Sequence, residues 1–168
     1  MTITGAAGTL TLGDNMTLSG TLNLPIADTI ISGGSLTLNG GLLEVSEDAS
    51  ISSAVIQEVS SEFSVATGKT LSYTGSSFDI SAYTLTLSGG GNFQSGGGLD
   101  LNNANSKLLL NSITLDSTTT SANSLGIDVD NDSTITSLSV ANITPVSIAS
   151  GKTLSGAITV TDGSLKLN

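Results

Sequence analysis

Residues 71–87, with the sequence LSYTGSSFDISAYTLTL, place two apolar residues two positions apart every seven residues. The beat continues to residue 129, and its pairs are Leu71/Tyr73, Phe78/Ile80, Leu85/Leu87, Leu99/Leu101, Ile113/Leu115 and Ile127/Val129. A spacing of two puts both side chains on one face of a β-strand. A coiled-coil heptad needs spacings of three and four instead. The beat therefore predicts short strands of equal length, separated by turns and repeated along the chain.

Two short phrases recur outside this stretch and extend the repeat over the whole chain. The first combines a glycine with alternating leucines and occurs as GTLTL (8–12), GTLNL (20–24), GSLTL (34–38) and GSLKL (163–167). The second occurs as VATGKTLS (65–72) and IASGKTLS (148–155). Glycine suits corners that need unusual backbone angles, whereas Leu, Ile, Val and Thr suit strands. The phrases predict strands that end at glycine-containing corners.

These observations predict an all-β fold, a parallel β-helix (β-solenoid) that forms a single domain over residues 1–168. Three strands of about seven residues would make a coil of about 21 residues, and about eight coils would fit. A β-sandwich is the alternative, because it also has short strands and glycine-rich turns. Residues 49–65 have some helical spacing, but they are rich in Ser and β-branched residues, which favour strands.

The composition limits the classes of function. Hydrophobic residues make up 38% of the chain and aromatic residues only 3%, so the core must be mainly aliphatic. The net charge of −10, with four lysines as the only basic residues, disfavours binding to nucleic acid or to anionic membrane surfaces. Cysteine is absent, which excludes disulfides, and no apolar run is long enough for a transmembrane helix. No signal peptide is visible, and we expect one to lie outside these residues.

One acidic segment has the spacing of a calcium loop. Asp128, Asp130 and Asp132 alternate along the chain and could offer carboxylate oxygens to Ca²⁺, which would be the only cofactor. Ser133 stands where such a loop has glycine, and Ser139 stands where it has its last glutamate. The three aspartates are therefore a weak calcium candidate, and a polar turn is the alternative.

A second acidic stretch raises the question of catalysis. It contains Glu44, Glu47, Asp48, Glu58 and Glu62, and paired carboxylates can hydrolyse glycosidic bonds. The chain has no His, Arg, Cys or Trp to supply a general base near neutral pH, a cation or a sugar-stacking ring. We therefore expect no enzymatic activity, and a carbohydrate-active β-helix is kept as an alternative.

The two ends of a solenoid carry unpaired strand edges, which natural proteins usually cap. Both ends of this chain have strand-like sequence, and neither shows a capping helix. We therefore predict assembly ends at Leu10 and Leu12 and at Leu165 and Leu167. Either the chain is a segment of a longer surface protein, or homotypic end-to-end contacts make it the protomer of an extracellular filament or matrix fibre.

The phrase VATGKTL (65–71), the recurring GTLTL and the Gly, Leu, Val, Ser and Ile content of residues 39–53 resemble bacterial autotransporter passengers and haemagglutinin-like adhesins. The resemblance implies a right-handed parallel β-helix at the bacterial cell surface that serves in adhesion, in biofilm or as a stalk. It implies a host or cell-surface glycan or protein as partner. We therefore expect a structural or adhesive extracellular β-solenoid.

Overall fold

The structure, a computed structural model, describes residues 8–121, 124–140, 145–161 and 164–167. The described chain contains no helix and winds into a β-solenoid of about seven turns, with about 20 residues per turn. Strands pair in parallel with the equivalent strand one turn away, which confirms the predicted fold and rules out the antiparallel sandwich. Residues 49–65 form three strands, as the β-solenoid requires.

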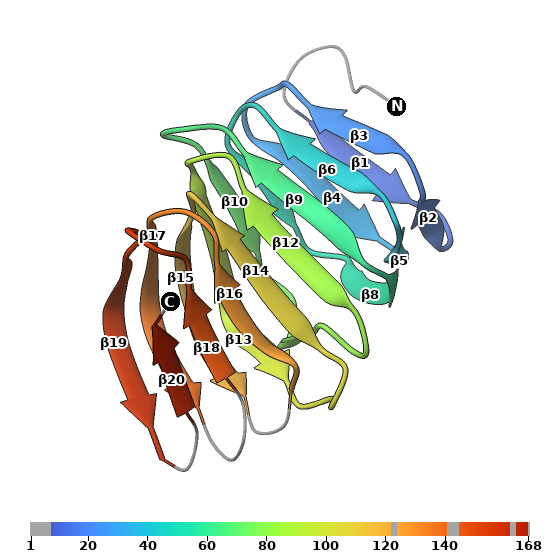
Figure 1. The fold of residues 1–168 in the computed structure, drawn as a ribbon. Helices are drawn as coiled ribbons and strands as arrows, with labels where there is room; N and C mark the ends of the chain where they lie inside the picture. The colour runs from blue at the N-terminus through green and yellow to red at the C-terminus, as the bar shows by residue number, and fades with distance from the viewer. Residues whose placement is uncertain (1–7, 122–123, 141–144, 162–163, 168) are drawn as a thin grey trace.

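The strands belong to three sheets, which form the sides of the solenoid (Figure 1). Sheet A contains β3 (Thr21–Leu24), β6 (Leu42–Val45), β9 (Ser61–Val65), β12 (Thr84–Ser88), β14 (Lys107–Asn111), β16 (Gly126–Val129), β18 (Pro145–Ile148) and β20 (Ser164–Leu167). Sheet B contains β1 (Thr9–Leu12), β4 (Thr29–Gly33), β7 (Ala49–Ile51), β10 (Thr70–Tyr73), β13 (Asn92–Leu101), β15 (Thr114–Ser121), β17 (Ser133–Val140) and β19 (Leu154–Val160), with β11 (Phe78–Asp79) beside β13. Sheet C contains β2 (Met16–Leu18), β5 (Ser35–Asn39) and β8 (Ala54–Val59).

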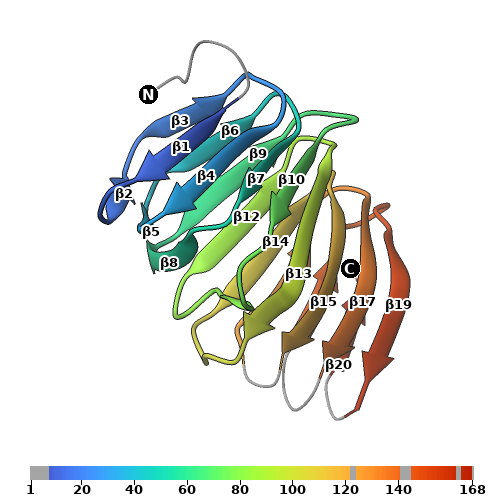
Figure 2. The same ribbon diagram turned by 180° about the vertical axis from the view of Figure 1, so that it is seen from behind.

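The coil is right-handed. In Figure 2 the strands of sheet B lie nearest the viewer and run downward, the chain advances from left to right, and it returns upward behind through sheet A. This is the hand that connections between parallel strands of one sheet almost always take.

Three strands per coil, as predicted, occur in the first four coils. Sheet C ends with β8 in the third coil, and in the fourth coil the short strand β11 pairs with β13 of sheet B instead. From the fifth coil on, the longer strands of sheet B cover two sides. These strands bend at irregularities in their pairing, which lie between Ser95 and Leu99 in β13 and between Leu115 and Thr118 in β15. Because a bulge bends a strand without ending it, one long strand replaces two short ones.

The interior is a stack of inward apolar side chains from successive coils. Every residue of the seven-residue beat is buried, with exposed fractions of 0–4%. Along sheet A the parallel register stacks one column of residues from the first coil to the seventh, namely Leu22, Leu43, Phe63, Leu87, Leu110, Val129 and Ile148. Each fully buried aliphatic side chain contributes roughly 1.5–3 kcal/mol. The core therefore runs along the whole axis.

Four of the five aromatic residues gather where sheet C ends, between the third and fourth coils, a boundary that we call the joint. Phe63 lies with its ring centroid 6.0 Å from that of Phe78 and 5.7 Å from that of Phe93, and Tyr73 lies 5.7 Å from Phe78. These large rings fill the interior at the place where sheet C ends. The rest of the core is aliphatic, as the composition predicts.

Candidate functional site

The phrase that ends in Gly-Lys-Thr-Leu-Ser forms the same corner both times, on the path from sheet A to sheet B. In the first copy the N–H of Lys69 donates to the carbonyl of Ala66 at 3.0 Å, and Gly68 between them has a φ of 74°. In the second copy the N–H of Lys152 donates to the carbonyl of Ala149 at 2.9 Å. A positive φ at the third residue alone is typical of a type II turn, which favours glycine there. The repeated sequence motif therefore forms a turn at the corner between sheet A and sheet B.

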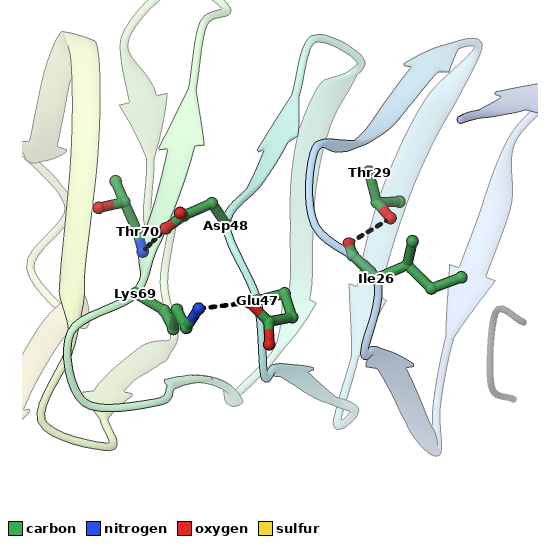
Figure 3. A network of polar contacts seen from close by, with 6 residues as sticks. All are labelled: Ile26, Thr29, Glu47, Asp48, Lys69 and Thr70. Carbon is green, nitrogen blue, oxygen red and sulfur yellow. Dashed lines mark hydrogen bonds and ion pairs between the residues drawn. The ribbon is translucent and has the colours of Figure 1, made fainter. Parts of the chain in front are cut away.

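A polar network joins this corner to the preceding coil (Figure 3). The ammonium of Lys69 forms an ion pair with the carboxylate of Glu47, and the backbone N–H of Thr70 donates to Oδ1 of Asp48 at 2.7 Å. The hydrogen bond with Glu47 raises the pKa of Lys69, and the charges of Glu47 and Asp48 add to this against a lowering by burial. The network fastens two coils at their corner.

The same device occurs near the other end of the solenoid. There the backbone N–H of Thr153 donates to Oδ1 of Asp132 at 2.8 Å, one coil earlier. An earlier corner uses a local bond instead, in which the hydroxyl of Thr29 donates to the carbonyl of Ile26 at 2.7 Å (Figure 3). Asp48 thus caps the first backbone N–H of β10, and Asp132 caps the N–H of the residue just before β19.

Shallow hollows follow this edge of the solenoid. One of about 260 Å³ is lined by Asp28, Ile30, Asp48, Ala49, Ser50, Thr70 and Ser72. A second, of about 320 Å³, shares Thr70, and a third, of about 200 Å³, shares Gly90 and Thr114 with the second. We call this row of hollows the corner groove. The hydroxyl, amide and carboxylate groups among its lining residues can exchange hydrogen bonds with a polar ligand.

The structure does not gather the three predicted calcium ligands. Asp128, in β16, forms an ion pair with Lys107 at 2.5 Å, and Asp132 accepts the bond from Thr153. Asp130 lies exposed after β16. The described residues contain no group of three or more His, Cys, Asp or Glu side chains placed to hold a metal ion. Calcium binding stays a prediction. If the three aspartates bind the ion, millimolar Ca²⁺ should raise the melting temperature of the protein modestly.

The other acidic stretch mainly links coils. Glu47 and Asp48 belong to the corner network, and Glu62 accepts a hydrogen bond from the hydroxyl of Ser88 at 2.5 Å. Glu44 and Glu58 lie exposed on β6 and β8. These positions suit a solvated acidic face and inter-coil hydrogen bonds.

The first coil contains buried and partly buried apolar residues. Leu10 and Met16 are partly buried, and the exposed fractions of Leu12, Leu22 and Leu24 are 6%, 1% and 0%. The strands β1, β2 and β3 each have a described strand neighbour on one side only. Of the two assembly residues predicted here, Leu12 lies in the core.

In the last coil, the inward residues Leu154 and Ile158 are only partly buried, and Val160 is 42% exposed. Leu138 and Val140, which pair with Ile158 and Val160 one coil earlier, are 1% and 0% exposed. The sequence analysis did not single out these residues, although β19 has apolar residues two positions apart, as the buried strands do.

Leu165 and Leu167, the other predicted assembly residues, lie in β20. The backbone register pairs them with Val146 and Ile148 of β18, so Leu167 is in register with the column of sheet A that ends at Ile148. Their side chains lie outside the described residues.

Comparisons of the chain with protein-family models, with curated proteins and with solved structures found no match. Across the described ranges, no helix is long and apolar enough to cross a membrane. The function must therefore be argued from the geometry of this chain.

Proposed function

We propose that this chain is a structural, adhesive rod of a bacterial surface protein. The observation that carries the proposal is the unbroken column of buried side chains along sheet A, from Leu22 in the first coil to Ile148 in the seventh. Stacked coils bury a continuous core, so neighbouring repeats support one another and the rod resists bending. Eight stacked strands make a rod about 4 nm long at ~4.8 Å per coil.

The extracellular placement rests on chemistry. The chain has no cysteine that oxidation could damage, and its net charge of −10 favours solubility. The resemblance to autotransporter passengers and haemagglutinin-like adhesins points to the same location. We propose that the partner is a glycan or protein of a host or cell surface, and that it contacts the polar corner groove. Nucleic acid and anionic membrane are disfavoured by the charge.

An antibody against the purified chain tests the location. It is applied to intact cells that make the native protein and to the same cells after lysis. Strong labelling of intact cells supports the proposal, and an antibody against a cytoplasmic protein is the control. Labelling that appears only after lysis would place the rod inside the cell and overturn the proposal.

A polysaccharide assay separates a structural rod from a carbohydrate-active β-helix, the second alternative. The chain is incubated with neutral and acidic polysaccharides, and new reducing ends are measured. We expect none above a boiled control, because the carboxylates of residues 44–62 link coils or face solvent. Hydrolysis that disappears when Glu44 and Glu58 are replaced by glutamine would favour the enzyme.

A further inference from the structure

One aromatic side chain of this protein is exposed. All five aromatic residues lie within the described ranges, and the chain has no tryptophan. Four of them are buried at the joint, with exposed fractions of 0–4%, whereas Tyr83 is 36% exposed. Tyr83 directly precedes β12, at the corner where the fourth coil enters sheet A. An exposed tyrosine offers a rigid apolar ring and a hydroxyl group to a ligand.

A hollow lies beside Tyr83, at the start of the sheet A strands, whereas the corner groove follows their ends. It has a volume of about 260 Å³, and Gly40 and Ser60 are among its lining residues. The backbone N–H of Thr84 donates to Oγ of Ser60 at 3.0 Å, which places Tyr83, the preceding residue, at the edge of the hollow. Val59 is 42% exposed and lies at the same edge, since a Cβ added to Gly40 would lie 3.8 Å from Cγ1 of Val59. We call this hollow, with Val59 and Tyr83 at its edge, the strand-start hollow.

Polar groups from two successive coils line the strand-start hollow. Ser60 and Glu62 belong to the third coil, and Thr86, which pairs with Glu62 in register, belongs to the fourth. Oε1 of Glu62 accepts a hydrogen bond from the hydroxyl of Ser88 at 2.5 Å, so Oε2 can accept one from a ligand. Oγ of Ser60 accepts the backbone N–H of Thr84, so the hydroxyl proton of Ser60 can be donated outward. Concave sites with apolar walls and a few polar groups are typical of ligand binding.

We propose that the strand-start hollow binds a sugar unit of a neutral glycan. A sugar ring is amphipathic: its C–H face can pack on Tyr83 and Val59, and its hydroxyl groups can donate to Glu62. The hydroxyls of Ser60 and Thr86 can exchange the remaining hydrogen bonds with the sugar. An apolar peptide segment fits less well, because it would bury these polar groups without partners.

Charge restricts the class of glycan. Glu62 lines the hollow, and Glu58 is exposed in β8 beside Val59. Lys107, one coil later, is held in an ion pair with Asp128. A carboxylate on the sugar would therefore be repelled, and the net charge of −10 acts in the same direction. A neutral glycan avoids this repulsion.

Saturation-transfer NMR with the purified chain tests the proposal. The panel contains neutral oligomers of glucose, galactose, mannose and N-acetylglucosamine, acidic oligomers of galacturonic and sialic acid, and the peptide Lys-Leu-Lys-Leu. We expect at least one neutral oligomer to bind, and we expect Tyr83→Ala and Glu62→Gln each to raise its dissociation constant about tenfold or more. Ile30→Ala is the matched control, because Ile30 is 40% exposed and lines the corner groove instead. Circular dichroism verifies that all three variants fold.

Four results would overturn the proposal: no neutral oligomer bound at millimolar concentration, binding unchanged in Tyr83→Ala, equal weakening by Ile30→Ala, or preference for the acidic oligomers. Equal weakening would move the glycan to the corner groove. Binding of the peptide alone would make the partner a protein. The proposal rests on the adhesive function only for the source of the glycan, and the antibody labelling tests that function separately, so the two can fail independently.

Discussion

Leu85 shows at the scale of one residue how the stack determines stability. Its side chain is 0% exposed, and its neighbours in register are Ser61 and Leu108. We expect Leu85→Asp to unfold the rod or to lower its stability by more than the ~2–5 kcal/mol of a Leu→Ala change, because a carboxylate would be buried without a partner. Thermal melting measures this loss. Thr84→Asp is the control, since Thr84 faces outward beside Lys107; equal losses in both variants would contradict the inward placement of Leu85.

The ion pair of Lys69 makes the stability of the rod depend on pH. Its pKa is raised, first by the hydrogen bond with Glu47, so the stabilisation is complete below the ordinary lysine pKa of about 10.4 and is lost as pH rises through the raised value. Melting temperatures between pH 9 and pH 12 measure the effect. We expect wild type to lose more than Glu47→Gln over this window, by a modest amount that salt reduces. Parallel curves for the two proteins would show that the ion pair does not affect stability.

At the scale of the element, the strands could be predicted from sequence and the coil length could not. Apolar residues two positions apart mark the inward face of a strand, so all twelve residues of the seven-residue repeat are buried as predicted. The sequence analysis missed the buried Phe93 and Leu110, because they lie off the seven-residue repeat. Corners absorb extra residues without disturbing the register: Ser61 pairs with Leu85, and Lys107 pairs with Gly126 after fewer residues. The alternation of inward and outward residues within each strand is therefore kept even though the number of residues per coil varies.

The corners themselves depend on backbone geometry that few residues accept. Gly89, after β12, has a φ of 101°, and a Cβ added there would lie 2.4 Å from the backbone oxygen of Val65. We expect Gly89→Ala to cost about 1–3 kcal/mol, which a fall in melting temperature of several degrees would report. Gly96→Ala is the matched control, because a Cβ there meets nothing within 4 Å. Similar losses in both variants would mean that the corner at Gly89 relaxes freely.

At the scale of the whole molecule, the rod is not uniform. The joint separates the three coils that contribute strands to sheet C from the later coils, and the sequence shows no break in pattern there because Phe78 and Ile80 keep the seven-residue repeat. Across the joint, sheet C contributes no strand pair among the described strands. In place of a strand pair, the side chain of Gln57, which is 3% exposed, crosses the joint and donates a hydrogen bond from Nε2 to the carbonyl of Thr84 at 2.8 Å. A few side-chain contacts thus replace a ladder of backbone hydrogen bonds.

Hydrogen exchange tests this weak interface. In a parallel strand alternate residues bond to opposite neighbours, so about half of the amides of β8 (Ala54–Val59) should lack a strand partner. We expect these amides to exchange about tenfold or more faster than those of β5 (Ser35–Asn39), which has β2 on one side and β8 on the other. The comparison uses one sheet of one molecule, so pH and temperature affect both strands alike. Equal protection of β8 and β5 would show that the joint is as tightly closed as the rest of the rod, and that its two halves unfold as one unit.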